Sequence, residues 1–389
     1  MDKVFYAYAR NNGVEAFLSF PASPYEMLDA LERLRLEDPG SAKFVIDEYY
    51  RFRSLGPFLS GENDLLQLNA LAQRLSELDN GQETAFEGLL SMEIRGKKNP
   101  LELPNLIDLA CSTDRCHVVG DALNDFQLGL FCAENGFLPG AEDLPEHLFN
   151  QLDFERIGRE HRQQTGGVLV ECDGGHPGGY VERYLELAEV YKTLDLTLKE
   201  PGYAMLLEIS HGPERAPLRL PASRKSINAV PGRLNAANWQ SLTLSCLDCR
   251  VPALMDLVSN RYDINFLNRL AQKLAGMSPK DLATYKALLE AAHCKDLFTA
   301  GELAEQLPNY TFSPQFTSPA SLAEEELTVI LCGPEAELIR KYLDLSGYGE
   351  ALVEKNGGVL TSYGLIERKD GQPVQSPQTA QREGGMNLA

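Results

Sequence analysis

Residues 64–75 read DLLQLNALAQRL, and residues 263–274 read DINFLNRLAQKL. A constant shift of 199 residues aligns the two stretches, pairing Asp64 with Asp263 and Asn69 with Asn268. In both, apolar residues recur three and four positions apart, which predicts an amphipathic helix. The acid before the leucines can cap the helix or face its positive end. Each stretch alone is an ordinary amphipathic helix, but such a helix does not explain why the stretch is repeated.

The repetition continues on both sides of these helices. Residues 20–23 (FPAS) recur as residues 220–223 (LPAS), with a shift of 200. Residues 152–169 recur as residues 343–360, with a shift of 191, and both end in Gly-Gly-Val-Leu. Three matched blocks in the same order indicate a duplicated module of about 190 residues, which is long enough to hold cores of its own.

Local patterns predict the elements of each module. The first module is expected to contain a hairpin over residues 3–20 turning at Asn-Asn-Gly, a helix over 24–36, a strand over 43–52, helices over 63–78, 82–94 and 105–112, a mixed region over 113–190 and a bridging helix near 183–193. The second is expected to contain strands over 203–210 and 217–220, a helix that Pro231 cuts short, helices over 263–275, 279–292 and 300–306, and a mixed region to about 370.

These elements predict an α+β protein, an elongated tandem duplication of small sheet-plus-helix, helical and mixed α/β domains. The first module is placed at residues 1–195, divided into 1–53 (sheet and helix), 54–112 (helical) and 113–195 (mixed). The second is placed at 196–370, divided into 196–245, 246–310 and 311–370 in the same way. Residues 371–389 are polar and rich in Gln, Gly and Pro, which predicts a disordered tail.

The net charge of −20 is shared unevenly between the halves. Residues 1–200 hold 35 acids and 18 bases, or −17, and residues 201–389 hold 21 acids and 18 bases, or −3. Residues 101–150 carry nine acids against one base, Arg115. Direct nucleic-acid binding is therefore disfavoured, because phosphates need Lys and Arg to displace their counterions. The excess of acids favours a basic binding partner. A simpler explanation of the negative charge is that it keeps the protein soluble.

No pattern of a known catalytic or metal site is recognisable. Walker A, nucleophile-elbow, kinase and metalloprotease motifs are missing, and the six histidines show no metal-ligand spacing. The eight cysteines are scattered, and the one close pair, Cys246 and Cys249, lacks a second pair or a nearby histidine. No apolar run is long enough for a membrane span, and the N-terminus lacks the apolar centre of a secretion signal. We expect a cytoplasmic, non-enzymatic protein without cofactor or metal.

Four blocks together resemble the ArdA-type antirestriction proteins of plasmids, conjugative elements and phages. They are the opening YAYARNNG…FPAS…ALERL, the two repeated helices, LPEHLFNQLDFERIGRE at residues 144–160, and GGVLVECDGGHPGGYVER at residues 166–183. The third is similar to the antirestriction motif of that family, through Asp153, Phe154, Glu155, Gly158, Arg159 and Glu160. The second copy of this motif departs from the pattern, because Ser346 and Glu350 replace Glu155 and Arg159.

The resemblance implies a protein that mimics bent B-form DNA and occupies the DNA path of type I restriction–modification enzymes in a bacterial host. Duplex DNA carries one charge per ~1.7 Å of axis, so a mimic needs carboxylates distributed over a surface. Proteins of that family pair as dimers, so a homodimer is possible, and a tandem duplication could instead supply both halves. The candidate partner-binding residues are Asp121, Asp125, Glu142, Asp143, Glu146, Asp153, Glu155, Arg159 and Glu160.

Two other functions stay open. The same fold could inhibit a CRISPR nuclease or another bacterial immune complex through shape complementarity, in which case binding would depend weakly on salt. An unrecognised enzyme would be indicated by a metal or nucleotide that copurifies with the protein. The sequence does not decide which defence system is the target, whether the second module contacts it, the oligomeric state, or the roles of Cys246 and Cys249.

Overall fold

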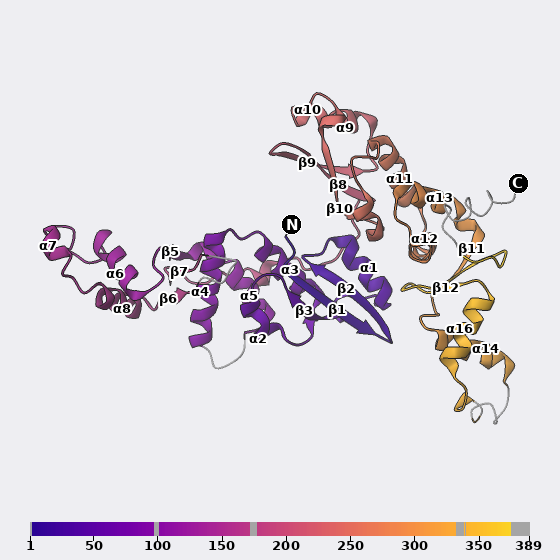
Figure 1. Cartoon of the computed structure of the whole chain (residues 1–389), viewed down its shortest axis with the longest axis horizontal. Helices are drawn as coiled ribbons and strands as arrows, with labels where there is room; N and C mark the ends of the chain where they lie inside the picture. Colours follow the sequence, from indigo (N-terminus) through magenta and orange to yellow (C-terminus); the bar gives the residue numbers. More distant parts are fainter. Residues whose placement is uncertain (1, 97–100, 172–176, 332–337, 339, 375–389) are drawn as a thin grey trace, which may run out of the picture. The chain divides into compact units, whose positions relative to one another are not determined.

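The computed structural model describes residues 2–96, 101–171, 177–331, 338 and 340–374, so residues 172–176 of the block at 166–183 and most of the predicted tail lie outside it. The described chain is a mixed α+β protein with small antiparallel sheets, as predicted (Figure 1). It divides into two compact units. Unit 1 comprises Met1–Ala9, Phe17–Ala22 and Asp38–Leu198, and unit 2 comprises Arg10–Ala16, Ser23–Glu37 and Lys199–Ala389.

The first sheet has the strand order β2-β1-β3-β4. Its strands are β1 (Phe5–Asn11), β2 (Val14–Phe20), β3 (Lys43–Tyr49) and β4 (Asn63–Asp64). The Asn-Gly turn between β1 and β2 has positive φ at both Asn12 and Gly13, which explains why this turn chemistry is used. The predicted hairpin and third strand are therefore confirmed.

The helical part of unit 1 contains the short α2 (Gly56–Leu59) and then α3 (Leu65–Ser76), α4 (Asn80–Gly96) and α5 (Leu103–Ala110). Asp64 caps α3 by accepting from the amides of Leu66 and Gln67, both at 3.1 Å. The buried Asn69 of α3 accepts from the Ala22 amide at 2.7 Å and donates to the Ala22 carbonyl at 3.2 Å. These two hydrogen bonds join the repeated helix to the FPAS turn. They also satisfy the buried Asn69 amide, which would be costly to leave without partners.

A second small sheet of unit 1 has the order β5-β7-β6. Its strands are β5 (Cys116–Val119), β6 (Val168–Val170) and β7 (Gly179–Arg183). Between β5 and β6 the chain forms α6 (Asp125–Glu134), α7 (Glu146–Phe149) and α8 (Phe154–Thr165). We call residues 121–165, which contain these three helices, the first lobe.

Unit 2 repeats this topology. Its first sheet, order β10-β8-β9, contains β8 (Met205–His211), β9 (Glu214–Leu220) and β10 (Thr243–Cys249). Its second sheet, order β11-β13-β12, contains β11 (Tyr310–Ser313), β12 (Val359–Leu360) and β13 (Leu365–Arg368). The register between β1 and β3 skips Asp47, and the register between β8 and β10 skips Leu247. A β-bulge at the same place in both copies is a strong sign of common origin.

The helices of unit 2 are α1 (Pro24–Leu34), the short α9 (Arg224–Asn228) and α10 (Val230–Arg233), α11 (Ile264–Gly276), α12 (Pro279–Ala291), α13 (Leu297–Gln306), α14 (Pro319–Ile330) and α16 (Leu345–Lys355). The interruption near Pro231 confirms the predicted short helix. Asn268 of α11 bonds the backbone of Ala222 at 2.7 and 3.1 Å, which repeats the contact of Asn69 with Ala22. One continuous core runs from β8 to β13.

The predicted bridging helix near 183–193 is wrong. Residues 184–190 form no helix, and only Tyr191–Thr193 make a single 3₁₀ turn. The side chains of Ser112 and Asp108 accept from the amides of Ala188 and Tyr191, at 2.9 and 2.7 Å. Arg115 donates to the Glu186 carbonyl at 2.6 Å. These tertiary hydrogen bonds satisfy the backbone in an extended form, so helical spacing of apolar residues misled the prediction.

Candidate functional site

The first lobe is built on a very close crossing of α6 and α8. A Cβ added to Gly129 would lie 1.8 Å from the Phe154 carbonyl oxygen, and one added to Gly158 would lie 1.9 Å from that of Asp125. Only glycine permits this approach of two backbones. The glycine of the motif therefore has a structural role, which is to set how α6 and α8 present their side chains.

Several charged residues of the first lobe neutralise one another. Arg162 donates to both carboxylate oxygens of Asp125, at 2.8 and 2.9 Å, and this bidentate bond raises the pKa of the guanidinium. Arg159 lies 4.0 Å from Asp125 and donates to Glu155 at 2.8 Å. Asp125 and Arg162 are the half-buried members of this group, and their ion pair joins α6 to α8.

Two further predicted residues have local partners on α8. Arg156 donates to Glu160 at 2.7 Å, one helical turn apart, and the hydrogen bond raises the pKa of Arg156. Asp153 accepts from the Arg156 amide at 3.0 Å and so caps the helix. Asp125, Asp153, Glu155, Arg159 and Glu160 are thus drawn together by the helix pair, with most of their charge balanced inside it.

The other four predicted carboxylates are open. Asp121, Glu142, Asp143 and Glu146 are exposed, and within the described residues no hydrogen bond or ion pair joins their side chains to another group. Glu134, at the end of α6, is equally exposed and was missed by the sequence reasoning. The lobe holds nine acids and three bases, a net charge of −6. The three bases are arginines of α8, and each forms an ion pair with a carboxylate of α6 or α8. The remaining negative charge of the lobe therefore lies mainly on the open carboxylates.

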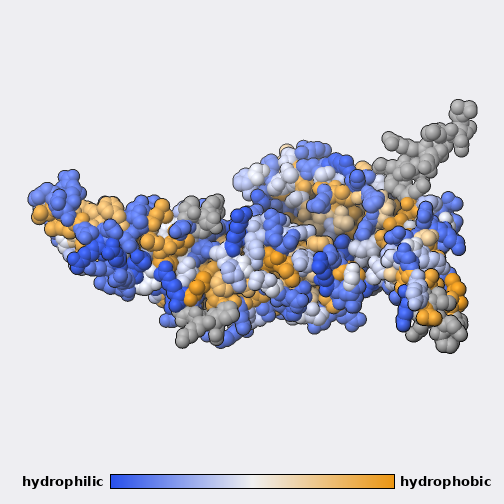
Figure 2. All heavy atoms as spheres, turned by 60° about the horizontal axis from the view of Figure 1, so that its bottom comes forward, coloured by the Kyte–Doolittle hydropathy of each residue, from blue (hydrophilic) through white to orange (hydrophobic). Residues whose placement is uncertain are grey.

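Large apolar side chains are exposed on the same lobe. Leu123 and Leu148 are each 48% exposed, and Phe126 and Phe137 are each 53% exposed. Figure 2 shows orange apolar residues among blue ones at the left-hand end, which carries α6, α7 and α8. The sequence reasoning did not single out these side chains, because apolar residues at helical spacing are ordinarily assigned to the core.

A partly buried chain of polar side chains holds the lobe to its sheet. Tyr180 of β7 hydrogen-bonds Thr165 at the end of α8 and donates to Glu182 at 3.0 Å. His161 lies 3.2 Å from the same carboxylate oxygen of Glu182. Burial raises the pKa of Tyr180, so the phenol stays protonated and can donate. These groups position α8 and have ordinary structural partners.

The second module has an equivalent lobe, residues 315–356. There α14 and α16 cross with Gly349 in place of Gly158, and a Cβ on Gly349 would lie 1.9 Å from the Pro319 carbonyl oxygen. The sequence of the segment contains eight acids and three bases, or −5, and two of these acids, Glu335 and Glu337, lie outside the described residues. Glu324, Glu325 and Glu326 of α14 are exposed. The net charge of residues 201–389 is close to zero because more basic parts of this half offset the acidic segment.

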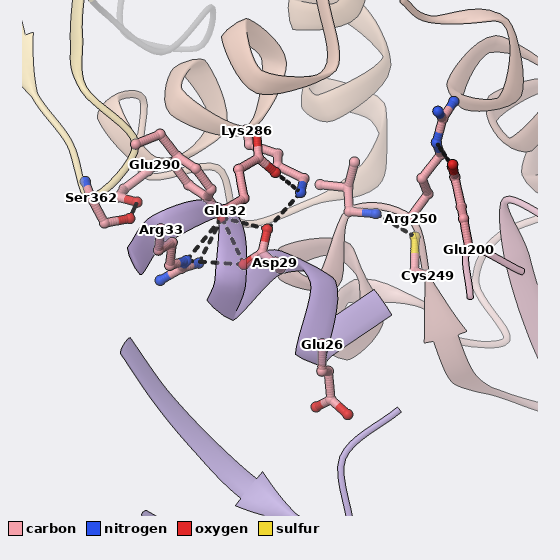
Figure 3. A network of polar contacts seen from close by, with 12 residues as sticks. Glu26, Asp29, Glu32, Arg33, Glu200, Cys249, Arg250, Lys286, Glu290 and Ser362 are labelled. Carbon is pink, nitrogen blue, oxygen red and sulfur yellow. Dashed lines mark hydrogen bonds and ion pairs between the residues drawn. The ribbon is translucent and has the colours of Figure 1, made fainter. Parts of the chain in front are cut away.

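The largest buried ionic network lies in unit 2, on α1 (Figure 3). Lys286 of α12 pairs with Asp29 at 2.7 Å and with Glu32 at 2.6 Å. Arg33 pairs with Asp29 at 2.9 Å and donates to the Tyr363 hydroxyl at 2.7 Å. Burial disfavours the charged form of Lys286, but Asp29 and Glu32 outweigh it, and the net effect raises its pKa. The two acids and two bases of these pairs balance and fasten α1, and Glu290 of the same network accepts from the amide and hydroxyl of Ser362 at 2.8 and 2.6 Å.

Other cavities and thiols offer no clear chemistry. A cavity of about 750 Å³ in unit 2 is lined by Lys273, Lys280 and Lys369, but Lys273 pairs with Glu305 and Lys369 donates to a backbone carbonyl at 2.6 Å. Burial raises the pKa of the thiols of Cys246 and Cys249 on β10, which disfavours the reactive thiolate.

Among the described residues, no three His, Cys, Asp or Glu side chains are grouped as metal ligands, and no helix is long and apolar enough to cross a membrane.

Comparison with protein-family models gives no match for this chain, and comparison with curated proteins gives no significant match either.

Proposed function

We propose that the chain is a non-enzymatic anti-defence protein that binds a DNA-acting immune complex in the cytoplasm of a bacterial host. The target put forward first is a type I restriction–modification enzyme, with the first lobe placed in its DNA path. The observation that carries the proposal is the set of open carboxylates, Asp121, Glu142, Asp143 and Glu146, on a lobe of net charge −6. The resemblance of the sequence to antirestriction proteins supports the same target.

Opposite charge would draw the first lobe into a DNA path. A DNA path is lined with cations that normally meet phosphates, and carboxylates spread over a rigid lobe can meet the same cations. The α8 arginines do not oppose this contact, because Asp125, Glu155 and Glu160 already balance them. The second lobe carries a sequence charge of −5, so one chain could supply two separate acidic lobes.

The direct test is cleavage of unmodified plasmid by a purified type I restriction enzyme, with increasing amounts of the chain. We expect inhibition, and we expect the triple variant Glu142→Gln, Asp143→Asn, Glu146→Gln to need at least about tenfold more protein for the same effect. The matched control, Asp47→Asn, Glu48→Gln, Glu62→Gln, removes three exposed acids of unit 1 outside the lobe and should inhibit like the unchanged chain. No inhibition at any concentration would contradict this target.

A second candidate is an inhibitor of a CRISPR nuclease or another immune complex that works by shape complementarity. The exposure of Phe126 and Phe137 favours it, because such side chains give salt-insensitive contacts. Inhibition of a CRISPR nuclease, with no effect on the restriction enzyme, would select this candidate.

A further inference from the structure

Phe126 and Phe137 are exposed on one side and fixed on the other. The Phe126 ring packs edge-to-face on the buried Phe154 with centroids 5.6 Å apart. The Phe137 ring lies 5.7 Å from Phe131 and 5.6 Å from His161. Rings held in this way lose little conformational entropy on binding, which is the property of an interface anchor.

Open carboxylates accompany these apolar side chains along the chain. Asp121 precedes Leu123, and Glu146 and Leu148 lie on the short helix α7. Glu142 lies beside Gly136, the residue before Phe137, with its carboxylate oxygen 3.1 Å from where a Cβ would stand. An open carboxylate therefore lies next to Gly136 in space, and the exposed leucines have open carboxylates close by in the sequence.

The charge decides which kind of partner fits. Nucleic acid and anionic lipid surfaces are both repelled by a lobe of net charge −6. A second copy offers lobes of −6 and −5, so lobe-to-lobe pairing is opposed as well. A basic protein groove attracts the carboxylates, and apolar pockets in its floor would receive the rings.

We propose that Phe126 and Phe137 are the apolar anchors by which the first lobe docks into a basic protein groove that contains apolar pockets. The inference rests on the proposed function and adds the residues that give the contact its affinity. Pure charge mimicry would lose its affinity as salt rises, whereas anchors of this kind keep a part of it.

The test measures the Kd of the full chain for the purified methyltransferase core of a type I enzyme at 50 mM and 500 mM salt. Phe126→Ser and Phe137→Ser are each expected to weaken binding by at least about tenfold at both salt concentrations. The triple variant Glu142→Gln, Asp143→Asn, Glu146→Gln should weaken binding at 50 mM and converge with the unchanged chain at 500 mM. Phe17→Ser is the matched control, because Phe17 is 51% exposed but lies on β2, outside the lobe.

The outcomes separate the two proposals. Binding by the unchanged chain that the Phe126 and Phe137 variants leave intact overturns the anchors alone. No binding at either salt concentration overturns the proposed function and the anchors together. Hydrogen exchange of α6 and α8 in each variant checks that the lobe is folded. A change in the sedimentation of the free chain on Phe→Ser substitution, without a change in Kd, assigns the rings to self-association and also overturns the proposal.

Discussion

At the scale of single residues, Lys286 makes the most demanding contact. Its side chain is 5% exposed and faces Asp29, which is 6% exposed, and Glu32. Removing one member of a buried ionic group leaves uncompensated charge, which costs roughly 3–5 kcal/mol. This contact explains why α1 belongs to unit 2 although it lies in the first module of the sequence.

We predict that Lys286→Met lowers the free energy of unfolding of unit 2 by about 3 kcal/mol near neutral pH. Lys225→Met, which removes an exposed lysine of α9, should change it by less than about 0.5 kcal/mol. Urea unfolding can be followed by the fluorescence of Trp239, the one tryptophan of the chain, which lies in unit 2.

The difference in free energy of unfolding between the unchanged chain and Lys286→Met should change with pH in one direction. The folded state raises the pKa of Lys286 above its ordinary value of 10.5, so its stabilisation is fully present below that pH. It is lost as pH rises through the raised pKa. The gap between the unchanged chain and Lys286→Met should therefore be flat from about pH 6 to pH 9 and shrink only in strong alkali. A gap that already closes near pH 8 would contradict the assignment.

The sequence alone showed which segments are rich in Asp and Glu. It did not show which of these carboxylates lack an ion-pair partner. Asp125 and Asp121 look alike in the sequence, yet Arg162, 37 positions away, engages only Asp125. The exposure of Phe126 and Phe137 was likewise unpredictable from their own neighbours, because it depends on how few side chains the crossing of α6 and α8 can cover.

At the scale of elements, the α6–α8 crossing depends on Gly158. Gly158→Ala would put a Cβ into the Asp125 carbonyl, so we expect the crossing to open and amide exchange in α6 and α8 to rise at least about tenfold. Gly120→Ala is the control, since nothing lies within 4 Å of its added Cβ. Amide exchange of α6 and α8, measured by mass spectrometry, should be unchanged in Gly120→Ala. Equal protection in both variants would show that the crossing tolerates a side chain.

Elements with strong local signals were predictable, and elements defined by tertiary contacts were not. The helix α11 followed from its leucine spacing and its Asp263 cap, which accepts from the Asn265 amide at 2.8 Å. The segment after β7 carried a similar apolar spacing but is extended, because Ser112 and Asp108 hold its amides. A local pattern cannot reveal a hydrogen-bond partner about 80 positions away.

At the scale of the whole molecule, duplication has kept the architecture and redistributed the charge. Both modules keep the order of three strands in the first sheet, the order of the second sheet, the bulge and the glycine of the helix crossing, whereas the fourth strand, β4, is described only in the first module. Both lobes are also acidic, at −6 and −5, although the halves of the chain differ as −17 and −3. Acidity is therefore concentrated in the same segment of both modules, whatever the charge of the rest of each half.

The most direct measurement of the central claim is competition between the chain and DNA for one enzyme. A fluorescently labelled duplex is bound to the methyltransferase core of a type I enzyme, and the chain is titrated at several duplex concentrations. If the lobe occupies the DNA path, the chain displaces the duplex completely, and its apparent Kd rises in proportion to the duplex concentration. A ternary complex, in which the duplex stays bound at saturating amounts of the chain, would contradict the account.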